Sequence, residues 1–248
     1  MNSIVGCHWT VRSDDARLRF ATLADALNTE GEEINANWMS RLVRVEAGSA
    51  AYYVKSYASR GRGLRRWIGR SRLRAEWENL LLFRAMGIAT ADVEAYGEEK
   101  DENGYRGALV TREIKGTRDL ADLAREESEF LLDREWRKAV IRRLSEAVRT
   151  MHERGFVHND LKWRNILVEL DREPGVYIID CPMGRTMAGP FLARGRIKDL
   201  ACLDKVGKWS LSRTDRLRFY LAYRNRCRLD RSDKGEIRKV LGFFSGRE

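Results

Sequence analysis

The residues best suited to chemistry in this chain flank two short aliphatic runs. Asn165 comes just before the first run, Ile166–Glu169. Asp180 comes just after the second run, Val176–Ile179, and turn-forming residues lie between the runs, which is typical of a β-hairpin. The open end of an antiparallel hairpin brings the two flanking positions side by side, with Asp160 nearby. Their hard oxygen ligands suit Mg²⁺ that arrives on a phosphate group, whereas a polar turn with capping side chains is the alternative.

A lysine in an upstream strand is the second candidate. Two strands are predicted at Ser40–Glu46 and Ala51–Tyr57, on either side of a short turn. Because side chains alternate along a strand, Lys55 points to the same side as Tyr53 and Tyr57. The lysine therefore lies on a defined face of the predicted sheet.

A helix predicted over residues 71–86 supplies a matching carboxylate. Glu76 lies on the apolar stripe of this helix, whereas other charged positions point to water. A carboxylate on a buried face needs a cationic partner, and Lys55 is the natural candidate. Pairing of Glu76 with the neighbouring Arg72 or Arg74 is the alternative.

The remaining elements divide the chain into a strand-containing first part and a helical second part. Ala108–Thr111 is predicted as a strand, and Asp133–Arg154 as a long amphipathic helix that ends at Gly155. We expect an N-terminal lobe over residues 1–111 and a C-terminal lobe over residues 112–248.

The bulk composition limits the class of protein. The chain has 248 residues, 43% of them hydrophobic, which is enough for two lobes with real cores. Its apolar runs are too short for a membrane span, and its N-terminus lacks the features of a signal peptide. The four cysteines form no C-x-x-C pair, so we expect reduced thiols in a cytoplasmic protein. The formal net charge of +10 favours an anionic partner, such as nucleic acid, an acidic membrane or a phosphorylated substrate.

The segment His158–Asn165 reads H-x-D-L-K-x-x-N, and a strand-ending Asp180 follows it. This pattern resembles the catalytic loop and metal-binding Asp of protein-kinase-like phosphotransferases. The resemblance implies an α+β fold with two lobes. The N-terminal lobe would hold a small mixed β-sheet and one helix, and the C-terminal lobe would be mainly helical. It also implies ATP and Mg²⁺ as cofactors.

The resemblance assigns roles to the residues of the second lobe. Asp160 would accept or orient the acceptor hydroxyl, and Lys162 would neutralise charge on the transferred phosphate. Asn165 and Asp180 would hold Mg²⁺. His158 is expected to brace the loop by hydrogen bonding rather than to take a proton itself.

The nucleotide would be held by residues of the first lobe and of the hinge. Lys55 would clamp the phosphates, and Glu76 would orient Lys55. The hinge position falls at Glu113 and Ile114, whose backbone groups would hydrogen-bond adenine.

Other polar residues receive structural roles. Asp199 is expected mainly to cap a helix that begins at Leu200, although the resemblance would also let it hold the catalytic-loop backbone. Cys181 is expected to be a small buried side chain. His152 has no partner that the sequence identifies.

Several departures from the protein-kinase pattern stand out. No G-x-G-x-x-G precedes Lys55, so the phosphate-covering turn must fall within Gly31–Ser40. Asn159 replaces the arginine that grips an activation-loop phosphate, and Cys181 and Pro182 replace the last two residues of D-F-G. Neither a phosphorylation switch nor a platform for peptide substrates is therefore expected.

A narrower resemblance covers residues 50–225. Several segments are similar to the bacterial lipopolysaccharide core kinases, which phosphorylate heptose or Kdo: Tyr53–Lys55, Arg74–Leu80, Gly87–Ile88, His158–Val168, Ile179–Asp180, Arg196–Ala201 and Leu211–Tyr220. This likeness implies ATP- and Mg²⁺-dependent transfer of phosphate to a sugar hydroxyl of the lipopolysaccharide inner core. It also implies a cytoplasmic enzyme that is peripheral on the inner membrane.

The segment Arg60–Arg74 is unusually basic and carries interleaved apolar residues. One hypothesis is that it contacts anionic lipid headgroups of the inner membrane, where each cation contributes about 1 kcal/mol. The alternative is a solvated loop that precedes the helix.

Three other classes of protein compete with the sugar-kinase reading. A small-molecule or protein kinase would share Asp160, Asn165 and Asp180, but small-molecule kinases usually carry an acidic pocket. A non-catalytic nucleotide-binding scaffold would not need every catalytic position filled. Nucleic-acid binding would explain the charge but not the residues at the hairpin end, so no nucleic-acid partner is expected. The sequence leaves the sugar, the hydroxyl and the oligomeric state undetermined.

Overall fold

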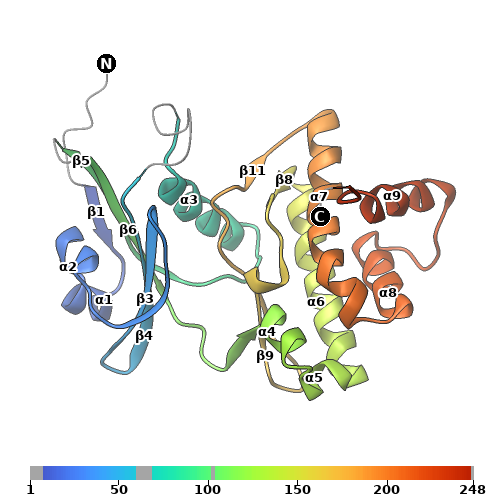
Figure 1. Ribbon diagram of the computed structural model, residues 1–248, viewed down its shortest axis with the longest axis horizontal. Helices are drawn as coiled ribbons and strands as arrows, with labels where there is room; N and C mark the ends of the chain where they lie inside the picture. The colour runs from blue at the N-terminus through green and yellow to red at the C-terminus, as the bar shows by residue number, and fades with distance from the viewer. Residues whose placement is uncertain (1–7, 60–68, 102–103, 247–248) are drawn as a thin grey trace. The chain divides into compact units, whose positions relative to one another are not determined.

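The computed structural model of the chain divides into two compact units (Figure 1). It describes three stretches: residues 8–59, 69–101 and 104–246. The first unit comprises residues 1–81 and 91–115, and the second comprises residues 82–90 and 116–248.

The first unit is built on a six-stranded antiparallel sheet with the strand order β1-β5-β6-β4-β3-β2. Its strands are β1 (His8–Val11), β2 (Glu32–Ala36), β3 (Ser40–Ala47), β4 (Ala50–Tyr57), β5 (Val93–Asp101) and β6 (Gly104–Arg112). Strand β4 lies inside the sheet between β3 and β6, so Lys55 is carried by a strand that is hydrogen-bonded along both of its edges.

Helices cover both faces of this sheet. Helices α1 (Asp14–Arg19) and α2 (Leu23–Leu27) share a buried apolar cluster with Tyr52 and Val54 of β4. Because neighbouring side chains alternate, Lys55 must point to the opposite face. There it meets helix α3 (Arg72–Ala85).

The second unit is mainly helical and carries two small antiparallel sheets (Figure 1). Its helices are α4 (Leu120–Arg125), α5 (Glu129–Leu132), α6 (Arg134–Glu153), α7 (Gly189–Ser210), α8 (Arg213–Tyr223) and α9 (Arg231–Leu241). Its strands are β7 (Thr117–Asp119), β8 (Phe156–Val157), β9 (Ile166–Glu169), β10 (Val176–Ile178) and β11 (Arg185–Thr186). A 3₁₀ turn, η2 (Trp163–Asn165), leads into β9.

The long helix α6 delivers the chain to the loop that follows it. Its buried stripe matches the helical repeat predicted from the sequence, and Asp133 caps its first turn through two backbone N–H groups. Gly155 follows the helix with a φ of 74°, a left-handed conformation that glycine adopts without strain. The helix therefore ends where the sequence predicts, just before β8.

The predicted fold class is confirmed, with two differences in the first unit. The sheet is antiparallel in its described pairings rather than mixed. Two short helices, α1 and α2, accompany α3, where the sequence predicts one helix. They are too short for a periodic apolar stripe, but their N-caps Ser13 and Thr22 were readable signals. Along the described stretches, no helix is both long and apolar enough to cross a membrane.

Candidate active site

The predicted pair of Lys55 and Glu76 is present. The Lys55 Nζ lies 2.9 Å from each carboxylate oxygen of Glu76, and the Tyr57 hydroxyl donates to the same carboxylate at 3.1 Å. The side chains of Lys55 and Glu76 are 18% and 6% exposed. The Lys55 ammonium also lies 5.7 Å from the centre of the Tyr57 ring. Sheet alternation and helical periodicity thus bring together two residues 21 positions apart.

The alternative pairing of Glu76 with a neighbouring arginine is wrong for Arg74. That guanidinium binds Glu78, with 2.8 Å between Nε and Oε1, and Arg70 binds the second oxygen of Glu78 at 2.7 Å. Burial disfavours the charged form of Glu78, but the two arginine hydrogen bonds outweigh it and lower the pKa of the carboxyl. Two cations of the predicted membrane segment are therefore engaged by a carboxylate of their own chain. The part of that segment between residues 60 and 68 lies outside the described residues.

The predicted hinge residues, Glu113 and Ile114, follow strand β6. The Glu113 backbone N–H donates to the Ala51 carbonyl at 2.8 Å, which extends the pairing of β6 with β4. The Glu113 carboxylate binds the Arg44 guanidinium at 2.7 and 3.1 Å, and this hydrogen bonding lowers its pKa. Because the Glu113 N–H is used within the sheet, a hydrogen bond from this residue to adenine would have to use its carbonyl oxygen. Ile114 follows directly after it.

The loop after β8 places a carboxylate between two cations. Asp160 is partly exposed, and its Oδ1 lies 2.7 Å from the Lys162 Nζ. The Arg164 guanidinium lies 3.9 Å from the second oxygen. The Lys162 N–H donates to the Asp160 carbonyl, which fixes the turn that brings the two side chains together. The carboxylate and the ammonium predicted to act on the transferred phosphate are therefore neighbours in this unit.

The two predicted metal ligands flank the open end of the hairpin. Strands β9 and β10 pair in the predicted antiparallel register, and the Ile179 N–H donates to the Asn165 carbonyl at 3.0 Å. The Asn165 amide nitrogen donates to the Asp160 carbonyl at 2.9 Å, which fixes the orientation of the amide and leaves Oδ1 as its acceptor. Asp180 has a φ of 54°, an unusual conformation for a non-glycine residue that is common at functional sites.

These residues suit Mg²⁺, which binds few protein oxygens and keeps water and phosphate oxygens as its other ligands. One amide oxygen and one carboxylate provide that kind of donor set. The described residues contain no group of three or more His, Cys, Asp and Glu side chains placed to hold a metal. The predicted site has only two protein ligands, Asn165 and Asp180, and would take its other ligands from the nucleotide phosphates and water, so it is smaller than such a group.

Buried Asp199 holds the catalytic loop from below. It is 0% exposed, and its carboxylate accepts the backbone N–H groups of His158 at 2.7 Å and of Asn159 at 2.8 Å. The predicted capping role of Asp199 is wrong, because α7 begins ten residues earlier, with Pro190 in its first turn. The loop-supporting role implied by the resemblance is the one observed.

His158 braces the loop through its ring. Its Nδ1 accepts the Asp160 N–H at 3.3 Å, and its Nε2 lies 3.3 Å from the Ile179 carbonyl. These partners assign the neutral tautomer with a proton on Nε2. Burial lowers the pKa of the ring, which favours the same neutral form. The predicted bracing role agrees with this geometry.

The structure also accounts for the residue types of Asn159 and Cys181. Asn159 has a φ of 66°, which asparagine tolerates better than most residues, and its side chain donates to the Met183 carbonyl at 3.1 Å. Cys181 is fully buried, as predicted. Cys181, Cys202 and Cys227 are not in disulfides.

Sequence reasoning missed the partners of His152. This histidine is 1% exposed, its Nδ1 lies 2.9 Å from the Tyr223 hydroxyl, and its Nε2 lies 3.3 Å from Asp199. The three residues come from α6, α8 and α7. Only the position of His152 on the buried stripe of α6 was readable from the sequence, whereas the other two contacts depend on how the helices pack.

Comparison with known proteins identifies the family. The family model described as "Lipopolysaccharide kinase (Kdo/WaaP) family" matches residues 20–223. The chain belongs to this lipopolysaccharide kinase family. The matched range contains Lys55, Glu76, Asp160, Asn165 and Asp180, so the predicted resemblance is confirmed.

A solved structure supports the fold of this family member. The chain is similar to a structure titled "WaaP in complex with acyl carrier protein", with a TM-score of 0.75 and 23% sequence identity. The match covers 96% of each chain. No curated protein matches this lipopolysaccharide kinase with significant similarity. Family membership makes the chain a kinase of lipopolysaccharide core biosynthesis.

Proposed function

We propose that this kinase uses ATP and Mg²⁺ to phosphorylate a hydroxyl of heptose or Kdo in the lipopolysaccharide inner core. The observation that carries the proposal is the arrangement of the loop and hairpin of the second unit. There, a partly exposed carboxylate, a lysine, a fixed amide and a strand-ending aspartate all belong to one short segment. Family membership supplies the class of acceptor.

The first unit would act as the nucleotide lobe. Lys55 would bind the phosphates of ATP, and Glu76 and Tyr57 would hold its ammonium group in place. A lysine that is already oriented by a buried carboxylate loses less side-chain entropy when it binds phosphate. Glu113 and Ile114 would meet the adenine through their backbone. The second unit would then be the acceptor lobe.

We propose the turn between β2 and β3 as the phosphate-covering segment. It lies within Gly31–Ser40, the range expected from the sequence. The Asn37 side chain accepts the N–H groups of Met39 and Ser40 at 2.9 and 3.1 Å, so this turn is ordered without glycines. Trp38, at its tip, is 67% exposed. Strand β3 leads from the turn to Leu42, the register partner of Lys55. We infer that the turn takes the role that a glycine-rich loop has in protein kinases.

Asp160 would accept or orient the proton of the acceptor hydroxyl, which needs this carboxylate within hydrogen-bond reach of the sugar. Lys162 would move from Asp160 to the transferred phosphate as negative charge develops there. Asn165 and Asp180 would hold Mg²⁺, which supplies charge neutralisation of the phosphates when bound. His158 and Asp199 would keep the loop in place during the transfer.

Two partners belong to this proposal. The first is an anionic inner-membrane surface, which the basic segment Arg60–Arg74 would contact. In the described part of this segment, Arg70 and Arg74 also bind Glu78. An acyl carrier protein is the second, because the similar WaaP structure contains one.

The second unit also contains an apolar cavity of about 590 Å³ lined mainly by residues of α6, α7, α8 and α9.

The test is transfer of label from γ-labelled ATP to a panel of acceptors, with and without Mg²⁺. The panel holds lipopolysaccharide that lacks core phosphate, a peptide mixture and a cationic small molecule. Label in the glycolipid with the native protein, and none with Asp160→Ala, supports the proposal. Label in another acceptor would favour a small-molecule or protein kinase, and ATP binding without transfer would favour a scaffold.

A further inference from the structure

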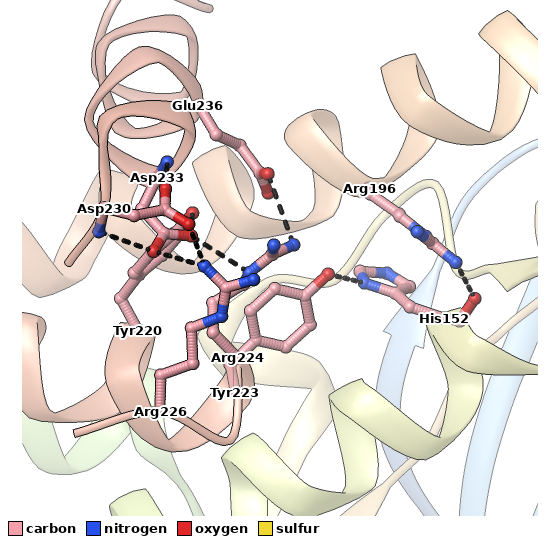
Figure 2. A network of polar contacts seen from close by, with 9 residues as sticks. All are labelled: His152, Arg196, Tyr220, Tyr223, Arg224, Arg226, Asp230, Asp233 and Glu236. Carbon is pink, nitrogen blue, oxygen red and sulfur yellow. Dashed lines mark hydrogen bonds and ion pairs between the residues drawn. The ribbon is translucent and has the colours of Figure 1, made fainter. Parts of the chain in front are cut away.

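A buried chain of hydrogen bonds leads from the predicted catalytic loop to helix α8, and Figure 2 shows its last contact, between His152 and Tyr223. It runs from the loop backbone to Asp199, then to the His152 ring, and from that ring to the Tyr223 hydroxyl. Asp199, His152 and Tyr223 are at most 5% exposed, so water cannot readily replace these hydrogen bonds.

The partners determine how each group is used. Asp199 is an acceptor, so the nearby Nε2 of His152 must carry the ring proton. In the tautomer with its proton on Nε2, Nδ1 is an acceptor and the hydroxyl of Tyr223 donates to it. Burial raises the pKa of the Tyr223 hydroxyl, which keeps the donor protonated. The contacts to Asp199 and Tyr223 thus agree on the tautomer in which His152 donates to Asp199.

The far end of the chain is fixed by ion pairs. Tyr223 is the last residue of α8, and Arg224 directly after it binds the fully buried Asp233 of α9 at 3.1 Å. Arg224 also lies 3.6 Å from Glu236, and Arg226 binds Asp233 at 3.0 Å (Figure 2). The end of α8 is therefore held against α9 where Tyr223 reaches inward to His152.

We propose that Tyr223 is a positioning residue for phosphoryl transfer: through His152 and Asp199 it holds the catalytic loop in place and ties that loop to helices α8 and α9. Asp199 keeps two loop N–H groups aligned, one on each carboxylate oxygen, and His152 is a third donor to the same carboxylate. Tyr223 holds the His152 ring from its other nitrogen, so the position of this third donor depends on Tyr223. The inference rests on the proposed function for its kinetic consequence but not for its structural one.

The chain provides a matched control one turn earlier. Tyr220 is also buried in α8, with its ring centre 6.2 Å from that of Tyr223, but its hydroxyl donates to Asp233 at 3.3 Å rather than towards the loop. Tyr223→Phe and Tyr220→Phe each remove one hydroxyl from a similar environment. Only the first should affect the loop.

The experiment measures amide hydrogen exchange at His158 and Asn159 in the full chain without substrate. Loss of one neutral hydrogen bond should speed exchange at both amides by about 3- to 10-fold in Tyr223→Phe, and by less than about 2-fold in Tyr220→Phe. The ¹⁵N shifts of the His152 ring should show a proton on Nε2 and a hydrogen-bonded Nδ1 in the native protein, and an Nδ1 without that hydrogen bond in Tyr223→Phe.

Kinetics give the third measurement. With the glycolipid acceptor, Tyr223→Phe should lower kcat several-fold and leave the KM for ATP unchanged, while Tyr220→Phe leaves both unchanged. Equal exchange rates in the two variants, or a native His152 ring protonated on Nδ1, would overturn the inference. The ring measurement on native protein decides the question even if Tyr223→Phe does not fold. Absence of any transfer by native protein would contradict the proposed function instead, since exchange and ring shifts do not depend on it.

Discussion

The pair of Lys55 and Glu76 allows a quantitative test of the proposed nucleotide lobe. Breaking a buried ion pair from one side costs about 3–5 kcal/mol, because the remaining charge loses its counter-ion. Lys55→Met leaves a carboxylate that is 6% exposed, so this variant should lose about 3–4 kcal/mol of its free energy of unfolding. Glu76→Gln leaves an ammonium group that is 18% exposed and partly hydrated, which should cost about 2–3 kcal/mol.

The double variant separates the interaction between Lys55 and Glu76 from the contribution of each side chain alone. Lys55→Met with Glu76→Gln leaves no unpaired charge from this pair, so its cost should be about 2–3 kcal/mol, well below the sum of the single costs. Urea unfolding of the four proteins, followed by circular dichroism, gives each free energy of unfolding. Arg74→Gln with Glu78→Gln is the matched control, since those side chains are 51% and 33% exposed and should couple by less than about 1 kcal/mol.

The two readouts distinguish stability from catalysis. All three variants of the Lys55 pair should lose phosphate transfer, including the double variant, whose loss of stability is well below the sum of the single losses. Single costs that add to within about 0.5 kcal/mol would refute the reasoning about the pair. Recovery of transfer in the double variant would refute the phosphate-binding role of Lys55.

Three further outcomes are expected. Asp180→Asn should reduce transfer at least about 100-fold and raise the Mg²⁺ concentration needed for half-maximal rate, as measured by metal titration; an unchanged titration would contradict its role as a ligand. Gly195→Ala should destabilise the protein by about 1–3 kcal/mol, because its Cβ would lie 2.7 Å from Val157, whereas Gly207→Ala, with its nearest neighbour at 3.6 Å, should be neutral or stabilising; urea unfolding compares them. The lowered pKa of His158 means that the unfolded chain takes up a proton first, so stability should fall as the pH drops below 6.5, by up to about 1.4 kcal/mol per unit, and His158→Gln should remove that part of the slope in unfolding titrations.

Much of the site was predictable because its geometry is local. Asn165 and Asp180 flank one hairpin, and pairing of adjacent strands fixes where its two ends lie. Lys55 and Glu76 are farther apart, but each sits in an element with a strict period, so the face of each could be worked out. Residue type supplied the rest, since a carboxylate on an apolar stripe requires a partner.

The support beneath the loop was not predictable in the same way. Asp199 lies within α7, and its neighbours along the chain suggest a helix cap. Its observed partners are 40 and 41 residues away in the sequence, so no local pattern could identify them. The missed signal was Gly189-Pro190, which marks the earlier start of the helix. Tyr223 reaches His152 across 71 residues through the packing of separate helices, and no period in the sequence records such a contact.

We propose that Asp160 directs phosphate from ATP onto an inner-core sugar. The most direct measurement is tandem mass spectrometry of core oligosaccharide released after incubation of the acceptor lipopolysaccharide with ATP, Mg²⁺ and either native protein or Asp160→Ala. We expect a mass increase of one phosphate group on a heptose or Kdo residue with native protein, and none with the variant. ATP consumption without phosphate on the sugar, or equal phosphorylation by Asp160→Ala, would contradict it.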